Sequence, residues 1–235
     1  MMNRSVAVSL RLLVLAMFVG CGGGDPKPVQ NILASYPELA SLVFENDYVR
    51  VVEFTLGPGD ELPLHHGGRR VVYALSDFTL EWLEGEAEPV TKKWTSGAVH
   101  FHDAVTHAAR NAGSTEARYL VVSRKTVPLP IIEAYGAERD VAAADADHSE
   151  AIFENDHVRV IEVHIAPGDK QPAHHGLNRL IYALSDYTIT YSSERSENEE
   201  SIVEIEDAHW HGPDDHAVEN TGETEAHYLV FAWKD

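Results

Sequence analysis

Short stretches of alternating apolar and polar residues run through most of the chain. Residues 51–56 place Val52, Phe54 and Leu56 on one face, and residues 160–165 repeat the pattern. A period of two is that of a β-strand, and segments such as Pro58-Gly59-Asp60 punctuate the stretches as turns. No long helical pattern interrupts them, so we predict an all-β sandwich or barrel. The predicted core residues are Val52, Phe54, Leu56, Ile161, Val163 and Ile165.

The chain contains a long internal repeat. Shifted by 109 residues, positions 44–122 align with positions 153–231 without a gap, and close to half of the aligned residues are identical. A repeat of this length is the size of a domain and indicates a duplication, not a solenoid. We therefore predict two domains, at residues 35–126 and 151–235, joined by a linker at residues 127–150. Two copies of one fold readily pack as an intramolecular pseudo-dimer.

The N-terminal segment has the pattern of a bacterial export signal. Arg4 and Arg11 are followed by an apolar stretch, Leu12–Gly20, that is too short to span a bilayer as a helix. The only cysteine comes next, and Phe18-Val19-Gly20-Cys21 resembles a lipobox, in which the cysteine is lipidated after cleavage. We predict that residues 1–20 are a signal peptide, that Cys21 anchors the protein to the membrane of the bacterial cell envelope, facing the periplasm or the exterior, and that residues 21–34 are a tether. An ordinary secretory signal cleaved nearby is the alternative.

Charge and composition exclude several classes of function. The formal net charge is −20, so the surface repels phosphate groups and no nucleic-acid partner is expected. A single cysteine cannot form an intrachain disulfide. The sequence has no nucleophile elbow, phosphate-binding loop or dinucleotide fingerprint, which leaves hydrolase and nucleotide-binding functions without support.

Two histidine motifs occur in each repeat. The first places Pro58-Gly59 before His65-His66 and an apolar strand at Tyr73-Ala74-Leu75, and the second places Asn111 four residues after His107. The matching histidines of the second repeat are His174, His175 and His216, although Glu206 replaces the glycine, Gly97, of the second motif. This order and spacing resembles the cupin superfamily twice, over almost the whole mature chain. The resemblance implies two tandem jelly-roll β-barrels with metal-binding histidines inside each barrel.

The chain departs from the cupin pattern in two ways. Arg70 and Arg179 stand where the resemblance places a metal-binding glutamate, so the acidic ligand is missing from both repeats. The paired histidines are also adjacent, and a regular strand would aim only one of them into the barrel. A bulge at Gly67 or Gly176 would turn both inward.

The candidate metal ligands form one set in each repeat. Imidazoles suit Zn, Cu, Fe, Ni or Mn, and a three-ligand set would leave a position open for water or substrate. The alternative is that these histidines only form hydrogen bonds in a degenerate barrel. The two sets are His65, His66 and His107, and His174, His175 and His216.

Other residues are candidates for binding a small anionic ligand. Arg70 and Arg179 require an anion, either a carboxylate of the protein such as Glu53 or Glu162, which we favour, or one of a ligand. Two histidine pairs share strand faces near the second motif, and we favour the arrangement in which these pairs face solvent while the intervening Phe101 and Trp210 are core. These pairs are His100 with His102, and His209 with His211. We interpret His164 and His227, which occur only in the second repeat, as surface variation.

Three functions remain. The first is an extracytoplasmic bicupin lipoprotein that binds a divalent transition metal or a small anion without committed chemistry. The second is a metal-dependent, dioxygenase-like enzyme, as the resemblance implies. The third is a structural envelope protein. The missing glutamate and the adjacent histidines favour the first.

Overall fold

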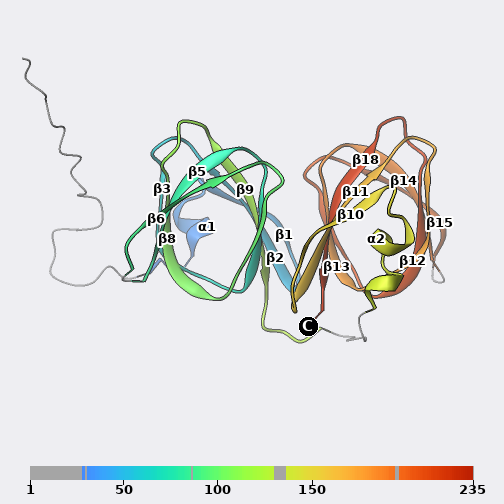
Figure 1. The fold of residues 1–235 in the computed structure, drawn as a ribbon, viewed down its shortest axis with the longest axis horizontal. Helices are drawn as coiled ribbons and strands as arrows, with labels where there is room; N and C mark the ends of the chain where they lie inside the picture. Colours follow the sequence, from blue (N-terminus) through green and yellow to red (C-terminus); the bar gives the residue numbers. More distant parts are fainter. Residues whose placement is uncertain (1–27, 30, 86, 130–135, 194–195, 235) are drawn as a thin grey trace, which may run out of the picture.

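The computed structural model describes residues 28–29, 31–85, 87–129, 136–193 and 196–234. In this part of the chain, 18 strands form four antiparallel sheets, which build two barrels side by side (Figure 1). The predicted all-β, two-barrel jelly-roll fold is therefore confirmed. None of the described helices is long and apolar enough to cross a bilayer. The predicted signal peptide and Cys21 lie outside the described residues.

The first barrel consists of a five-stranded and a four-stranded sheet. The larger sheet has the order β1-β2-β9-β4-β7 and the smaller sheet the order β3-β8-β5-β6. The strands are β1 (Ala40–Glu45), β2 (Val49–Leu56), β3 (Glu61–Gly67), β4 (Arg70–Ala74), β5 (Phe78–Glu84), β6 (Val90–Trp94), β7 (Val99–His102), β8 (Val105–Asn111) and β9 (Ala117–Arg124).

The second barrel repeats this arrangement. Its sheets have the orders β10-β11-β18-β13-β16 and β12-β17-β14-β15. Shifting by 109 residues superposes the strand bounds of the two barrels, except that β13 and β15 begin earlier than their counterparts. The strands are β10 (Ser149–Glu154), β11 (Val158–Ile165), β12 (Lys170–Gly176), β13 (Asn178–Ala183), β14 (Tyr187–Ser193), β15 (Ser196–Val203), β16 (Ala208–His211), β17 (Asp214–Asn220) and β18 (Ala226–Trp233).

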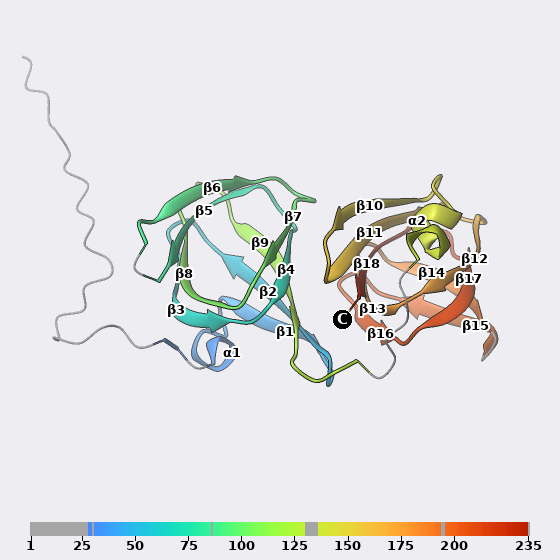
Figure 2. The same cartoon turned by 60° about the horizontal axis from the view of Figure 1, so that its bottom comes forward.

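The larger sheet of each barrel is apolar on both faces, because one face lines its own barrel and the other face packs on the opposite barrel. The inward residues of β2 and β11 lie in the two separate barrel cores, as predicted from the alternation. The outward residues, such as Val51 and Val160, join one apolar layer between the barrels, with Leu120, Leu229 and Trp233. Strand β1 contacts β16, and reciprocally β7 contacts β10 (Figure 2), as in a two-fold dimer.

A polar contact joins the barrels at one end of this layer. Arg118 on β9 forms ion pairs with Glu53 of its own barrel and, at 2.8 Å, with Glu206 of the second barrel. Glu206 has a φ of 71°, in the left-handed region that its counterpart Gly97 adopts with a φ of 84°. The duplication has therefore kept the turn while replacing its glycine with a residue that binds the first barrel.

A short helix accompanies each barrel. Helix α1 (Ile32–Ser35) is capped by Asn31, whose side chain accepts a hydrogen bond from the Ala34 amide. Helix α2 (Val141–Ala144), after the 3₁₀ turn η1 (Ala137–Arg139), is capped in the same way by Asp140. Although α2 lies within the predicted linker, Val141 is buried in the core of the second barrel.

Truncating a residue of the inter-barrel layer should destabilise the protein. Leu229 is fully buried there, so Leu229→Ala should lower the free energy of unfolding by about 2–5 kcal/mol. Ile202→Ala, at a position that is 78% exposed, is the control and should change it by less than about 0.5 kcal/mol. Urea unfolding followed by circular dichroism measures both. Equal stability of the two variants would contradict the packing of this layer.

Candidate functional site

One histidine of each adjacent pair points into its barrel. His65 is buried and lies opposite His107 in the pairing of β3 with β8, while His66 is exposed at the rim. In the second barrel His174 is buried opposite His216, and His175 turns toward Asp215, 2.8 Å away. The irregularity of β3 lies between Leu62 and His65, before the pair, so the bulge predicted at Gly67 or Gly176 is wrong and alternation separates the two side chains.

The two inward histidines of each barrel lie side by side. The ring centroids of His65 and His107 are 4.2 Å apart, and those of His174 and His216 are also 4.2 Å apart. The Nδ1 of His65 lies 2.8 Å from the carbonyl oxygen of Pro63. A carbonyl only accepts, so Nδ1 carries the proton and Nε2 presents a lone pair.

A buried arginine lies against these histidines. Arg70 is 3% exposed, and its guanidinium donates to the carbonyls of Gly68 at 2.8 Å and Asp103 at 3.2 Å, with His107 Nδ1 3.4 Å away. A Cβ on Gly67 would lie 2.6 Å from Arg70 Nη1, and a Cβ on Gly176 would lie 2.2 Å from Arg179 Nη1. These glycines therefore make room for the guanidinium.

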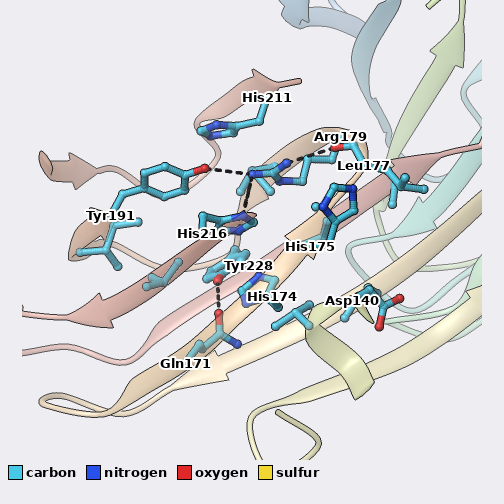
Figure 3. A pocket seen from close by; sticks show the side chains of 18 of the residues that line it. Asp140, Gln171, His174, His175, Leu177, Arg179, Tyr191, His211, His216 and Tyr228 are labelled. Carbon is cyan, nitrogen blue, oxygen red and sulfur yellow. Dashed lines mark hydrogen bonds between the residues drawn. The ribbon is translucent and has the colours of Figure 1, made fainter. Parts of the chain in front are cut away.

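The two buried arginines differ in their neutralisation. The predicted partners were wrong, because Glu53 and Glu162 lie on the outer face, where they pair with Arg118 and His227. Arg179 instead binds Asp214 at 2.9 Å and donates to the Tyr191 hydroxyl at 3.2 Å; Figure 3 shows this arginine between Tyr191, His216 and Leu177.

The counterpart of Asp214 in the first barrel is Val105. Among the described residues, no carboxylate forms an ion pair with Arg70. Burial lowers the pKa of Arg70 to about 10, which leaves the guanidinium charged at neutral pH.

A second charge difference lies at the edge of each barrel interior. Arg159 binds both Asp140 at 2.9 Å and Glu154 at 2.8 Å. In the first barrel, Asn31 stands in place of Asp140, and Arg50 and Lys125 share the single carboxylate of Glu45. The described residues that line the first interior include Arg50, Arg70 and Lys125 but no carboxylate. In the sequence, this asymmetry appears at two positions where the repeats differ in charge: Asn31 corresponds to Asp140, and Val105 corresponds to Asp214.

The interiors also differ in volume. The first barrel encloses a cavity of about 420 Å³, which falls in the range of small-molecule sites, and the second only about 60 Å³. Larger side chains occupy several positions of the second interior: Leu177, Ile181 and Val218 replace Gly68, Val72 and Ala109.

The pairs His100 with His102 and His209 with His211 face inward, so the expectation that they face solvent is wrong. His102 lines the first cavity and stacks on Trp82, and His209 and His211 line the second interior. His100 lies beside Trp94, with ring centroids 4.0 Å apart. The intervening Phe101 and Trp210 are partly buried and pack against the apolar layer between the barrels.

Burial keeps the interior histidines neutral. It lowers the pKa of His107 to about 2, with smaller contributions from His65 and Arg70, and that of His102 to about 4. In the second barrel it lowers the pKa of His174 to about 4 and that of His211 to about 3. A neutral imidazole can bind a metal or accept a hydrogen bond.

The interior donor set fits a metal ion poorly. Each barrel brings two of the predicted imidazoles together, but a permanently charged guanidinium lies beside them where the resemblance implies a carboxylate ligand. Within the described part of the chain, the group of three metal-ligating side chains that gathers most tightly is Glu162, His164 and His227, outside the barrels. Metal binding by the interior histidines stays a prediction, and we derive no chemical step through it.

No family model and no curated protein matches the sequence, but solved structures share its fold. AerE from Microcystis aeruginosa is 18% identical, with a TM-score of 0.62, over 89% of this chain and 97% of AerE. An oxalate decarboxylase of Lactobacillus farciminis is 12% identical (TM-score 0.56; 81% and 78% covered). A salicylate 1,2-dioxygenase from Pseudaminobacter salicylatoxidans is 10% identical (TM-score 0.51; 79% and 71% covered). At these identities the likeness is one of fold.

The neutral interior histidines should make the protein sensitive to acid. Below about pH 6.5 the unfolded chain protonates a histidine that the folded protein keeps neutral, so stability falls with pH by about 1.4 kcal/mol per pH unit for each such residue. Because burial lowers the pKa of His107 to about 2, His107→Gln should reduce this slope by about that amount between pH 6 and 5. Urea unfolding at several pH values measures it, with His66→Gln as the control. An unchanged slope in His107→Gln would contradict a neutral His107.

Proposed function

From the two-barrel cupin fold that this chain has, we propose that its first barrel binds a small organic anion, in a protein anchored to the cell envelope through Cys21. The ligand would carry a carboxylate and an apolar body. The second barrel would serve as a closed scaffold. The protein would act as a binding or sensing protein.

The observation that carries this proposal is the buried charge of Arg70, with which no carboxylate of the described residues forms an ion pair. Isolated buried charges are strongly unfavourable, and arginine cannot escape the cost by losing its proton. In the second barrel, Asp214 neutralises the equivalent arginine. The first barrel instead offers a cavity of about 420 Å³ beside Arg70. A ligand carboxylate would supply the missing anion and accept hydrogen bonds from the guanidinium.

The rest of the cavity indicates the chemistry of the ligand body. Trp82 stacks on His107 with ring centroids 4.0 Å apart, and Arg70 lies 5.7 Å from the centroid of Trp82. Phe54 and Trp94 also line the cavity. Such walls suit an aromatic or aliphatic body next to the anionic head. The names of two structures that share the fold, salicylate 1,2-dioxygenase and oxalate decarboxylase, denote carboxylate substrates.

Those names also keep a metal-dependent enzyme as the alternative. It would need a metal held by His65 and His107 next to a guanidinium, without the carboxylate ligand. The anion proposal needs no further group, because the cavity, the cation and the apolar walls are all in place. We therefore give it precedence.

Salicylate should bind to the full-length chain through Arg70. Arg70→Gln should weaken binding by about 1.5–3 kcal/mol, or about 10- to 150-fold, because a charge-assisted contact is lost. Val105→Asp, which installs the carboxylate of the second barrel, should also weaken it. Arg179→Gln is the matched control and should leave the affinity unchanged. Isothermal titration calorimetry measures all four proteins, with circular dichroism to verify folding.

Neutral salicylamide should bind more weakly than salicylate to the wild type. Equal binding of the two compounds, or binding of salicylate that Arg70→Gln and Val105→Asp leave intact, would contradict an anion site at Arg70. Oxalate, which lacks an apolar body, tests whether the cavity walls contribute to affinity.

The lipid anchor is tested separately. The wild type should fractionate with membranes and carry a lipid on Cys21, whereas Cys21→Ser should be soluble or unprocessed, because the acceptor thiol is lost. Cell fractionation and mass spectrometry of the N-terminal peptide provide the measurement. A wholly soluble wild type that begins beyond residue 21 would show that the segment is an ordinary secretory signal.

A further inference from the structure

Two histidines and a carboxylate gather on the outer face of the second barrel. His164 on β11 and His227 on β18 lie directly opposite each other, and their rings stack with centroids 3.9 Å apart. Glu162 precedes His164 by two residues and so shares its face of β11. Its Oε1 atom lies 2.8 Å from His227 Nε2 and 3.8 Å from His164 Nε2.

We infer that Glu162, His164 and His227 bind a divalent transition-metal ion at a site separate from the proposed anion cavity. Two imidazoles and one carboxylate form a ligand set that zinc accepts, with a further position open to water. Ligand atoms around a tetrahedral zinc ion are about 3.3 Å apart, given bond lengths of about 2.0–2.1 Å. The two nitrogen distances to Glu162 Oε1 lie on either side of this value, so small side-chain rotations suffice.

A neighbouring carboxylate orients one of the ligands. Glu225 Oε1 lies 3.1 Å from His164 Nδ1, so the Nδ1–H group donates a hydrogen bond to it and Nε2 is left as the metal-binding atom. A carboxylate on the far nitrogen of a ligating histidine is the usual support of such sites. The side chains of Glu162 and His164 are 26% and 48% exposed, so an ion can enter from solvent.

Comparison with the first barrel shows that this site lacks a permanent cation. There the positions of Glu162, His164 and His227 are occupied by Glu53, Thr55 and Arg118. Arg118 supplies a permanent cation to Glu53 and to Glu206 across the interface.

No lysine or arginine of the described residues forms an ion pair with Glu162. Gly97 stands where Glu206 would have its counterpart, so the first barrel offers no carboxylate at that position. Burial raises the pKa of Tyr73, on the first barrel, to about 12, and the charge of Glu162 adds to this rise. A divalent cation would take the role that Arg118 has on the opposite side.

Zinc titration of the full-length chain, purified without a histidine tag, tests the site. We expect His164→Ala and His227→Arg to lose one equivalent of bound Zn²⁺, or to bind it at least about tenfold more weakly. His227→Arg restores the residue type of the first barrel and its pairing with the glutamate, so the fold should be kept. His107→Ala combined with His216→Ala removes one imidazole from the buried histidine pair of each barrel and should leave this equivalent in place.

Competition with a chromogenic chelator gives stoichiometry and affinity, and the NMR signals of the two imidazoles should shift together on saturation. The same Zn²⁺ binding in the wild type and in His227→Arg would overturn the inference. So would loss of all bound Zn²⁺ in the interior double variant. Neither result bears on salicylate binding, so this inference and the anion proposal fail separately.

Discussion

A guanidinium buried beside two histidines constrains everything else in each barrel. It requires a glycine at position 67 in the first barrel and at position 176 in the second, because a Cβ there would collide with the guanidinium. It occupies space beside His107 or His216 and so limits which further ligand the imidazoles can share. Above all it demands a negative charge, since arginine keeps its proton even when burial lowers its pKa. The two barrels meet this demand differently.

Because the barrels arose by duplication, each position of one barrel can be compared with the equivalent position of the other. The second barrel supplies Asp214 and Asp140 to its buried cations and fills the remaining space with larger side chains. The first barrel lacks both acids and keeps its cavity. On the outer faces the order is reversed. Arg118 neutralises Glu53 in the first barrel, whereas the ion-pair partners of Glu162 among the described residues of the second are histidines. The equivalent outer surfaces of the two barrels thus carry different sets of charged residues.

Much of the fold could be predicted from the sequence, because strand alternation is local and the 109-residue repeat fixes the domain size. The inward orientation of Val52 and Ile161 followed from the same period. Alternation also limited each histidine pair to one inward member, but the register that selects His65 depends on pairing with β8. His102 was assigned to the wrong face because both faces of β7 are covered, one by the cavity and one by the second barrel. The partner of Arg179 depended on spatial proximity that no local pattern encodes.

The way in which the chain enters the first barrel has a consequence for where a ligand is met. The Val29 amide donates to the Leu64 carbonyl at 2.7 Å, and Val29, Ile32 and Leu33 line the cavity. The chain from Cys21 to Val29, at about 3.5 Å per residue, reaches no farther than about 30 Å. With a lipid on Cys21, the cavity would stay within roughly one bilayer thickness of the membrane surface. It would sample the molecules that leave or approach that surface in preference to those in the bulk solution, so anchoring would itself act as a filter on ligands.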